Sequence, residues 1–265
     1  MKKLGLILIS IFLVLVAIHF LISPKSNEFK ENDMLEDIQK RGYILVGINP
    51  DSKPYGFIDD NGVYAGYDVD LAHYIAKYIL KDSSKLKFIP ITPSNRLLKA
   101  TTGEVDIVIS TVTITPQREE VVNFSIPYDY AGQALLVRGD SDITSISDLN
   151  NRTVGIVFGT TAEKNIKNLI PNSILRGYRS YNDAYNALKA GNIEAITSDD
   201  TILNRYAITD SSVKLLSKRY SKEPYGIAFK KGNSSIKFRN EINFILEDIK
   251  RKNIINNLRN KWGIE

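Results

Sequence analysis

A group of hydroxyl side chains followed by an arginine is the part of this sequence with the clearest chemical character. In VISTVTITPQREEVVNFSIPYDY, an expected strand ends at Ser110, the hydroxyls of Thr111, Thr113 and Thr115 follow it, and Arg118 comes shortly after them. A guanidinium presents a planar fork of donors that fits a carboxylate at two points. Hydroxyls and free backbone groups at a strand end can pair with the other polar atoms of a small ligand. The pattern indicates a socket for a zwitterion; the alternative is a strand, a turn and a surface arginine.

The composition restricts the kinds of protein that this chain can encode. Its 265 residues, 43% of them apolar, are enough for one large domain or for two lobes with buried cores. Cysteine is absent, which excludes disulfides, thiolate metal sites and a lipid on an N-terminal cysteine. The net charge of +5 is mild and scattered, so nucleic acid is not an expected partner. The sequence has no phosphate loop and no metal-ligand motif, so we expect neither a cofactor nor a metal.

The first 22 residues differ in composition from the rest of the chain. Two lysines precede an apolar run from Leu4 to Ile22, which is the pattern of an export signal. About 20 apolar residues would also span a bilayer as a helix, and no small-x-small cleavage site follows. We therefore expect residues 1–22 to be a signal peptide or an N-terminal membrane anchor, and residues 23–33 to be a tether. The remainder would be periplasmic or extracytoplasmic, held to the cytoplasmic membrane by residues 4–22 if they stay uncut.

Segments that resemble buried strands alternate with helical segments along most of the chain. Apolar runs predict strands at residues 43–47, 86–91 and 105–110, and apolar positions at helical spacing predict a helix between the first two. The same order recurs in the second half of the chain. This alternation predicts an α/β protein with mainly parallel sheets flanked by helices. Asn49 and Tyr55 lie on the loop after the first strand, at the end of the sheet where open α/β folds place ligands.

Two extended segments connect the halves of the chain, the first at YDYAG and the second at KEPY. A lobe inserted into another lobe through two crossings has a cleft and a hinge, and it can close around a small ligand. The expected organisation is lobe 1 at residues 34–127 and 226–265, hinge segments at 128–132 and 221–225, and lobe 2 at 133–220.

At this point the sequence resembles the extracytoplasmic solute-binding proteins of polar amino-acid ABC transporters, which is bacterial solute-binding protein family 3 with the type II periplasmic-binding fold. The strings that carry the resemblance span about Leu35 to Trp262: GYDVDLA, NRLLKATTGEVDIVISTVTITPQR with FSIPY, GTTAEKN, ALKAGNIEAITSDD and EPYGIAFKKG. The resemblance implies a two-lobed monomer that captures an amino acid and presents it to an ABC permease in the membrane. It does not imply catalysis.

The resemblance assigns three positions to the α-carboxylate of the ligand. Arg118 matches the arginine that holds the carboxylate, and the backbone of Thr113 matches a second donor. Thr161 matches a donor from lobe 2, at a helix start where free N–H groups favour anions. Residues 160–163, TTAE, also have the pattern of a capping box, and one segment can serve both purposes.

Three other positions match groups that bind the α-ammonium. Ser110 and Thr111 match acceptors on lobe 1, and Asp199 matches a carboxylate on lobe 2. Asp199 would otherwise cap the helix that is expected to start near Thr201, but Asp200 could cap that helix instead. A zwitterion would then bridge the lobes through its two opposite charges, which couples its affinity to closure.

The pocket for the ligand's side chain is expected near Asn49, Tyr55 and Arg96. Family members with an Asn-Arg pair like Asn95 and Arg96 often bind glutamate, aspartate or glutamine. Relatives that bind acids can carry a lysine at the position of Asn49, so this departure keeps glutamine open. The absence of an aromatic residue at Ser52 argues against arginine and histidine as ligands. Arg96 as a solvated helix-start residue is the alternative.

Two other classes of function remain open. Cyclohexadienyl dehydratases resemble these binding proteins, but His19 lies in the export segment and His73 on a helix away from the expected cleft. No histidine is therefore placed as a general base, and we expect no enzyme activity. An envelope-tethered amino-acid sensor is the other alternative, and an uncleaved anchor would suit it.

Overall fold

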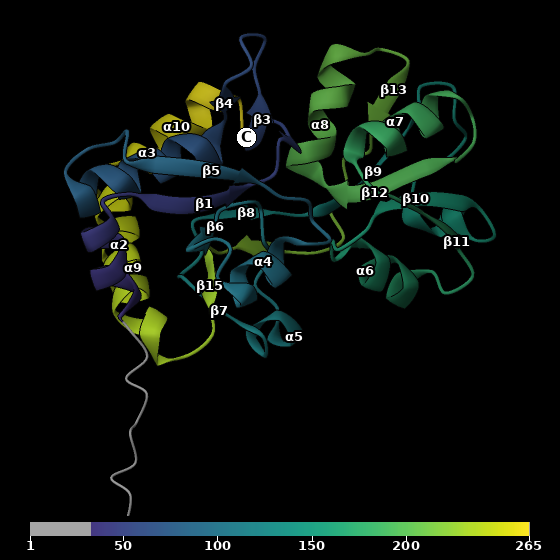
Figure 1. The fold of residues 1–265 in the computed structure, drawn as a ribbon. Coiled ribbons are helices and arrows are strands. Elements are labelled where there is room, and N and C mark those ends of the chain that lie inside the picture. Colours follow the sequence, from purple (N-terminus) through teal and green to yellow (C-terminus); the bar gives the residue numbers. More distant parts are fainter. Residues whose placement is uncertain (1–32, 265) are drawn as a thin grey trace, which may run out of the picture. The chain divides into compact units, whose positions relative to one another are not determined.

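The structure is a computed structural model that describes residues 33–264 (Figure 1). The expected signal peptide or anchor at residues 1–22, and the tether up to residue 32, lie outside the described residues. Within residues 33–264, no helix is both long enough and apolar enough to cross a lipid bilayer. Contacts between residues group Asp33–Glu265 into one unit, which contains two five-stranded sheets.

The first lobe is built on a sheet with the strand order β5-β1-β6-β15-β7. Its strands are β1 (Ile44–Ile48), β5 (Leu86–Pro90), β6 (Ile107–Val108), β7 (Val122–Phe124) and β15 (Ala228–Lys230). Its helices are α2 (Met34–Arg41), α3 (Tyr67–Leu80), α4 (Arg96–Thr102), α5 (Pro116–Glu119), η2 (Asn233–Ser235), α9 (Ile236–Arg251) and α10 (Ile254–Trp262). Figure 1 shows α3 and α10 on one face of this sheet and α4 on the other.

The second lobe repeats this plan with the strand order β11-β10-β12-β9-β13. Its strands are β9 (Gln133–Arg138), β10 (Thr153–Val157), β11 (Ile174–Tyr178), β12 (Ala195–Asp199) and β13 (Val213–Leu215). Its helices are η1 (Ile146–Leu149), α6 (Ala162–Leu169), α7 (Tyr181–Lys189) and α8 (Asp200–Thr209). In Figure 1, α7 and α8 lie on one side of the sheet and α6 on the other.

The two sheets share a mixed pattern of strand directions. In each sheet three strands are parallel, β5-β1-β6 in one and β11-β10-β12 in the other. The remaining pairs, made by β15 and β9, are antiparallel. The predicted α/β architecture with two lobes is confirmed. The expectation of mainly parallel sheets describes only the three strands that are linked through helices, because a chain that enters a sheet from an extended crossing can pair antiparallel.

Between the lobes, β8 (Asp129–Ala131) pairs antiparallel with β14 (Glu223–Tyr225). These two strands lie within the expected hinge segments. Near them, β2 (Asp51–Ser52), β3 (Gly56–Ile58) and β4 (Tyr64–Ala65) form a small antiparallel sheet on the first lobe. The segment that follows the first strand is therefore a folded hairpin with a defined position.

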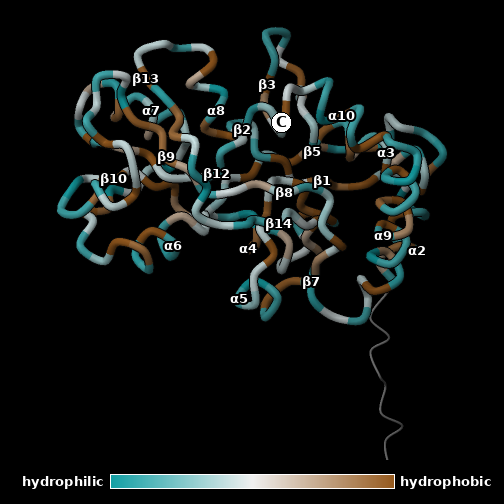
Figure 2. Tube along the Cα trace, turned by 180° about the vertical axis from the view of Figure 1, so that it is seen from behind, coloured by the Kyte–Doolittle hydropathy of each residue, from teal (hydrophilic) through white to brown (hydrophobic). Residues whose placement is uncertain are grey.

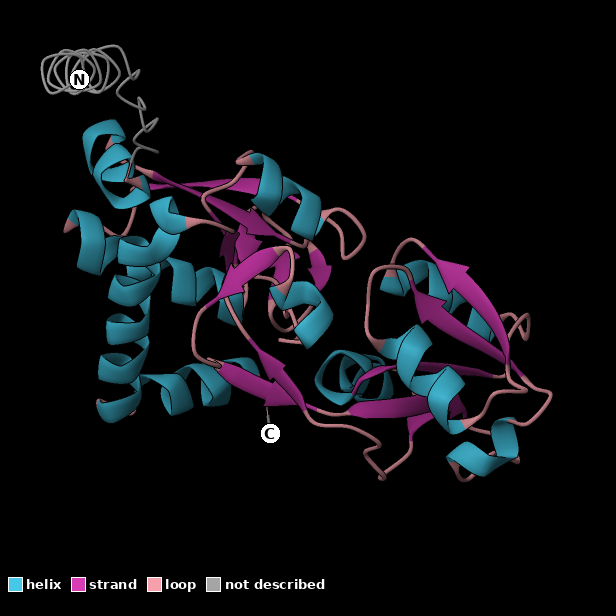
Figure 3. Ribbon diagram, turned by 90° about the horizontal axis from the view of Figure 1, so that it is seen from below, coloured by secondary structure: helices cyan, strands magenta, loops and turns pink. Residues whose placement is uncertain are grey.

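Hydrophobic patterning explains why the helices take these places. In α9 the buried residues are Phe238, Ile242, Ile245, Leu246 and Ile249, which lie on one face at helical spacing. In β9 five of the six residues are buried, as expected for a strand that is covered on both faces. Figure 2 shows hydrophobic residues concentrated in the sheet strands, and Figure 3 shows helices on both sides of the sheets.

The start of α3 depends on a close backbone approach at Gly66. Gly66 has a φ of 124°, and a Cβ there would lie 2.1 Å from the carbonyl oxygen of Tyr55. The contact lets the N–H groups of Tyr67 and Asp68 donate to the carbonyls of Pro54 and Tyr55, at 3.0 and 2.9 Å. The hairpin is thereby docked onto the first turn of α3.

We predict that Gly66→Ala lowers the free energy of unfolding by about 3 kcal/mol or more, because it adds a backbone clash to an unfavourable φ. Gly62→Ala is the matched control: Gly62 also has a positive φ, 78°, but a Cβ there meets nothing within 4 Å. Gly62→Ala should lower the free energy of unfolding by only about 1 kcal/mol. Urea denaturation followed by circular dichroism measures both, and equal losses would contradict the close approach.

Candidate ligand-binding site

Two arginines of the first lobe converge on one backbone carbonyl of the second. Arg118, in α5, donates from Nη2 to the carbonyl oxygen of Gly159 at 2.9 Å, and from Nη1 to that of Thr113 at 2.8 Å. Arg96, at the start of α4, donates from Nη2 to the same Gly159 oxygen at 3.4 Å. Gly159 lies on the loop after β10, where a Cβ would come 2.3 Å from the carbonyl oxygen of Pro93. The lobes are therefore in close contact at this point.

Neither guanidinium forms an ion pair within residues 33–264. Their partners are backbone carbonyls, which include that of Ser110 at 2.5 Å from Arg96 Nη1. The Nε of Arg96 is buried and makes no hydrogen bond with the described residues. Burial lowers the pKa of both arginines, and the neighbouring charge of Arg96 helps to lower that of Arg118 to about 10. Arginine side chains stay protonated at neutral pH, so two guanidinium groups without a directly paired carboxylate among the described residues favour an anion here.

Local structure fixes the position of Arg118 and of the predicted backbone donor. Thr115 caps α5 by accepting from the N–H of Arg118 at 3.3 Å, and Pro116 occupies the first turn. Thr113 forms an isolated antiparallel bridge with Tyr225, in which the hydrogen bonds are made by the N–H groups of neighbouring residues. The N–H of Thr113 therefore points away from β14 and donates no hydrogen bond within the described chain, as a carboxylate donor requires.

Ser110 and Thr111 are buried, and their carbonyls face Arg96. Thr111 has a φ of +46°, which is rare for a β-branched residue and is typical of functional sites. Its N–H lies 3.2 Å from Oδ2 of Asp68 and 3.1 Å from the hydroxyl of Tyr128. Arg96 Nη1 donates a hydrogen bond to the carbonyl oxygen of Ser110 and lies 3.4 Å from the carbonyl oxygen of Thr111. The Ser110 hydroxyl is buried without a partner among the described residues, so it is the group left for a ligand.

Asp199 ends β12 and stands directly before α8. It makes no side-chain cap; its Oδ2 accepts from the hydroxyl of Tyr225 at 2.5 Å. Asp200 instead accepts from the N–H of Thr201 at 2.8 Å and from Arg219 Nε at 2.6 Å. Burial raises the pKa of Asp199 to about 7, against the effect of the Tyr225 hydrogen bond. Because Asp199 does not cap α8, its carboxylate is available to an ammonium group.

Thr161 stands at the N-cap of α6, but the expected capping box is not formed. Its hydroxyl donates to Oε2 of Glu223 at 3.2 Å, and the Thr160 hydroxyl donates to the carbonyl of Val157 at 2.7 Å. The capping prediction is wrong because both hydroxyls find partners away from the helix start. The first hydrogen bond of helical type in α6 runs from the N–H of Asn165 to the carbonyl of Thr161. The amides before Asn165 therefore have no partner within the helix and can donate to an anion.

Asn49 and Tyr55 hold the hairpin in place. Asn49 is buried; its amide donates to the Ser52 hydroxyl at 2.5 Å, and its Oδ1 accepts from the N–H of Asp51 at 3.2 Å. Tyr55 is fully buried, and its hydroxyl donates to Asp129 at 3.0 Å. Its ring meets those of Tyr67 and Tyr225 edge to face. In this arrangement Tyr55 is a core residue beside the crossings.

Four residues of the site were missed by sequence reasoning: Asp68, Tyr128, Glu223 and Tyr225. Burial raises the pKa of Asp68 to about 7, and its carboxylate holds the strained Thr111 rather than capping α3. Glu223 binds Thr161 and also Asn165, whose Nδ2 lies 2.8 Å away. The available signal was a charged residue within an otherwise apolar or aromatic string, as in GYDVDLA and EPYGIAF.

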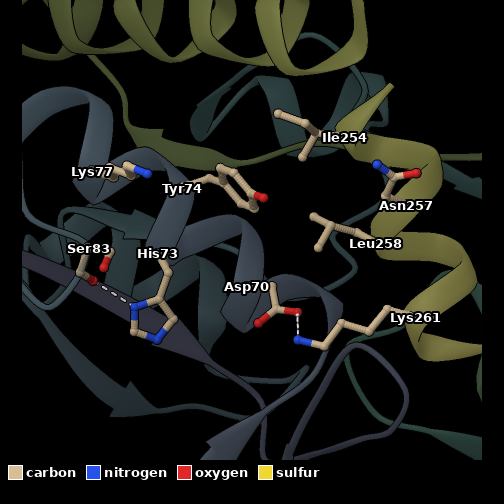
Figure 4. Close-up of a pocket in the computed structure, with 9 residues that line it drawn as sticks. All are labelled: Asp70, His73, Tyr74, Lys77, Ser83, Ile254, Asn257, Leu258 and Lys261. Atoms are coloured by element: carbon tan, nitrogen blue, oxygen red, sulfur yellow. Dashed lines mark hydrogen bonds and ion pairs between the residues drawn. The ribbon is translucent and has the colours of Figure 1, made fainter. Parts of the chain in front are cut away.

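His73 lies apart from this cluster, as expected. Its Nδ1 is 2.7 Å from the carbonyl oxygen of Ser83. It lines a cavity of about 420 Å³ between α3 and α10, where Figure 4 shows Asp70 paired with Lys261. None of the predicted ligand-binding residues lines this cavity.

Comparison with known proteins agrees with this fold. Residues 44–265 match the model of the bacterial extracellular solute-binding proteins, family 3. The chain is 35% identical to the ABC transporter glutamine-binding protein GlnH of Bacillus subtilis, over 99% of this chain and 97% of that protein. It is 39% identical to a glutamine-binding protein of Geobacillus stearothermophilus, over 73% and 74% of the two chains.

A solved structure has the same fold at similar identity. It is an ancestral amino acid-binding protein, described as a precursor of cyclohexadienyl dehydratase, with a TM-score of 0.80 and 35% identity. The match covers 86% of this chain and 98% of that one. The chain belongs to the family 3 extracellular solute-binding proteins, whose members act outside the cytoplasm.

We predict that the affinity for a zwitterionic amino acid such as glutamine rises with pH up to about 7 and then levels off. Asp199 must be ionised to pair with an ammonium, and its pKa is raised to about 7 in the ligand-free protein. Binding at about pH 6 should therefore release protons, while binding at about pH 8, where Asp199 is largely ionised and the ligand still carries its ammonium, should release far fewer. Calorimetry in buffers of different ionisation heat measures the release.

Asp199→Asn should remove most of this proton release and weaken binding about tenfold or more. The raised pKa also means that the ligand-free carboxyl contributes stability that declines as pH rises from about 4 towards 7. An unchanged proton release in the variant would assign the titration to another group.

Proposed function

We propose that this protein captures a polar amino acid between its two lobes and presents it to an ABC permease. The observation that carries the proposal is a pair of arginines, Arg96 buried and Arg118 partly buried, that meet a carbonyl of the opposite lobe and have no carboxylate partner among the described residues. A ligand carboxylate is a charged acceptor, and charge-assisted hydrogen bonds are about twice as strong as neutral ones. If the arginines exchange the Gly159 carbonyl for the carboxylate of a bound ligand, the closed state gains stability, and it gains this stability only when ligand is present.

The remaining polar groups complete a site for the amino-acid backbone. Arg118 and the N–H of Thr113 would hold the α-carboxylate from one side, and the first amides of α6, beginning at Thr161, from the other. Asp199 and the hydroxyl of Ser110 would receive the α-ammonium. Charge-assisted hydrogen bonds contribute about 1.5–3 kcal/mol each, so a few of them reach the roughly 8 kcal/mol of micromolar binding.

Arg96 makes glutamine, glutamate or aspartate the favoured ligands. It is the second cation of the site, and its Nε is free to donate to a side-chain amide or carboxylate. Both of the glutamine-binding relatives support glutamine among the three. Arginine as a ligand is disfavoured, because its own positive charge would face Arg96 and Arg118.

The wider assignment follows from the same model of function. Lobe 1 would comprise residues 34–127 and 226–265, lobe 2 residues 133–220, and the crossings the hinge. The protein would act as a monomer outside the cytoplasm, with residues 4–22 as an anchor if they are not removed. It would bind without catalysis; formation of product from prephenate or arogenate would instead support the dehydratase-like function.

Arg118→Ala should weaken binding of the best ligand at least about 100-fold, because two charge-assisted bonds to the carboxylate are lost. A thermal-shift screen of the twenty amino acids identifies that ligand, and calorimetry measures its affinity. Arg138→Ala, which removes a partly exposed arginine paired with Asp140 on the second lobe, is the control and should bind normally. Unchanged affinity in Arg118→Ala would overturn the assignment.

Arg96→Ala should weaken glutamate binding at least about tenfold more than glutamine binding, since only glutamate loses a charge partner. Arg96→Lys retains the charge and should preserve the order of the two ligands. Competition calorimetry gives the ratio, and the melting temperature shows that each variant is folded. If the ratio is the same in all three proteins, Arg96 does not contact the ligand's side chain.

A further inference from the structure

A carboxylate of the first lobe is bound by two helices of the second, at a different place from the arginine cluster. Asp51, in β2, accepts at Oδ2 from the N–H of Tyr181 at 2.7 Å and from the N–H of Asn182 at 3.4 Å. Its Oδ1 accepts from Nη2 of Arg205, in α8, at 3.3 Å. The Asp51 carboxylate thus accepts hydrogen bonds from two backbone amides in the first turn of α7 and pairs with the arginine of α8.

The helix start is shaped to receive this carboxylate. Ser180 caps α7 by accepting from the N–H of Asp183 at 3.0 Å, which leaves the first two amides of the helix without an acceptor on their own lobe. Asp51 supplies that acceptor from the opposite lobe. A negative charge at a helix N-terminus is also favoured by the helix dipole.

Arg205 is held in position for the contact. Its Nη2 donates to Oδ1 of Asn182 at 2.9 Å, and the hydroxyl of Tyr206 donates to the same oxygen at 2.9 Å. The ring of Tyr206 stacks on that of Tyr185, with centroids 4.2 Å apart. The side chains of Asp51 and Arg205 are only 19% and 15% exposed, so solvent screens this pair less than it screens a surface pair.

The same segment connects this contact to the candidate ligand site. The N–H of Asp51 donates to Oδ1 of Asn49, so the two residues belong to one fixed turn. When the lobes separate, the carboxylate and its three donors must part, because they are carried by different lobes. The interaction therefore contributes free energy to the closed form alone.

We propose that Asp51 and Arg205 form an interlobe latch that slows release of the bound amino acid without touching it. The proposal rests on the proposed function for its ligand. Asp51 acts as a positioning residue: it changes the population of the closed form, and the ligand affinity follows that population.

The test compares Asp51→Asn with Asp60→Asn in the full chain. Asp60 is exposed, lies on the same hairpin and loses the same charge, but no hydrogen bond or ion pair joins its side chain to the second lobe among the described residues. Stopped-flow release of glutamine should be about tenfold faster in Asp51→Asn, with the association rate changed less than about threefold. Asp60→Asn should match the native protein. An unchanged release rate in Asp51→Asn would overturn the latch.

Arg205→Gln tests the pair from the other lobe, and it replaces Asp51→Asn if that variant melts early. Arg205→Gln should also speed release, and the double variant should be no faster than the faster single variant, because both remove one interaction. Additive effects would overturn the pairing.

A readout without ligand separates this proposal from the proposed function. The chain has no cysteine, so Lys85→Cys and Asn172→Cys, both at exposed positions, give one dye on each lobe. Asp51→Asn should lower the energy transfer of the ligand-free protein, which indicates more of the open form. If no amino acid binds the native protein, the proposed function fails, and this measurement still decides the latch: unchanged transfer overturns it.

Discussion

The candidate site depends on a positive charge that the protein does not neutralise by itself. Arg96 and Arg118 are largely removed from water, yet they share the Gly159 carbonyl as an acceptor instead of a carboxylate. Burying a charge without a charged partner is unfavourable and is rarely maintained without a function. The acids of the site, Asp68 and Asp199, are bound by hydroxyl or amide groups. Cations and anions are thus kept unpaired, and a zwitterion can neutralise both.

The crossings between the lobes take part in this arrangement directly. On β14, Tyr225 binds Asp199 and Glu223 binds Thr161. On β8, Asp129 accepts from Tyr55 and pairs with Arg259 of α10. The backbone that must flex when the lobes move therefore holds side chains of the candidate site in place. A change in hinge geometry would alter the site without any intervening relay.

The sequence predicted the fold because its signals are local. Apolar alternation and helical spacing identify strands and helices within ten or fifteen residues, and α9 and β9 follow those patterns closely. Arg118 stays a prediction that the sequence suggests because its hydroxyl-rich neighbourhood is contiguous with it. The partners of Thr161 and Thr111 were not, because Glu223 lies 62 residues from Thr161 and Asp68 lies 43 residues from Thr111. The capping box failed because the Thr160 hydroxyl donates to the nearby carbonyl of Val157 and the Thr161 hydroxyl donates to the distant Glu223.

The single tryptophan of the chain occupies a useful position. Trp262 donates from Nε1 to Asp70 at 2.7 Å, and its ring meets that of Phe57 edge to face at 5.6 Å. Phe57 belongs to β3, which pairs with the strand that carries Asp51. Any displacement of that hairpin changes the surroundings of one indole with no other indole to obscure it. The protein thus contains its own optical probe, whose emission reports on movements of the hairpin without an added label.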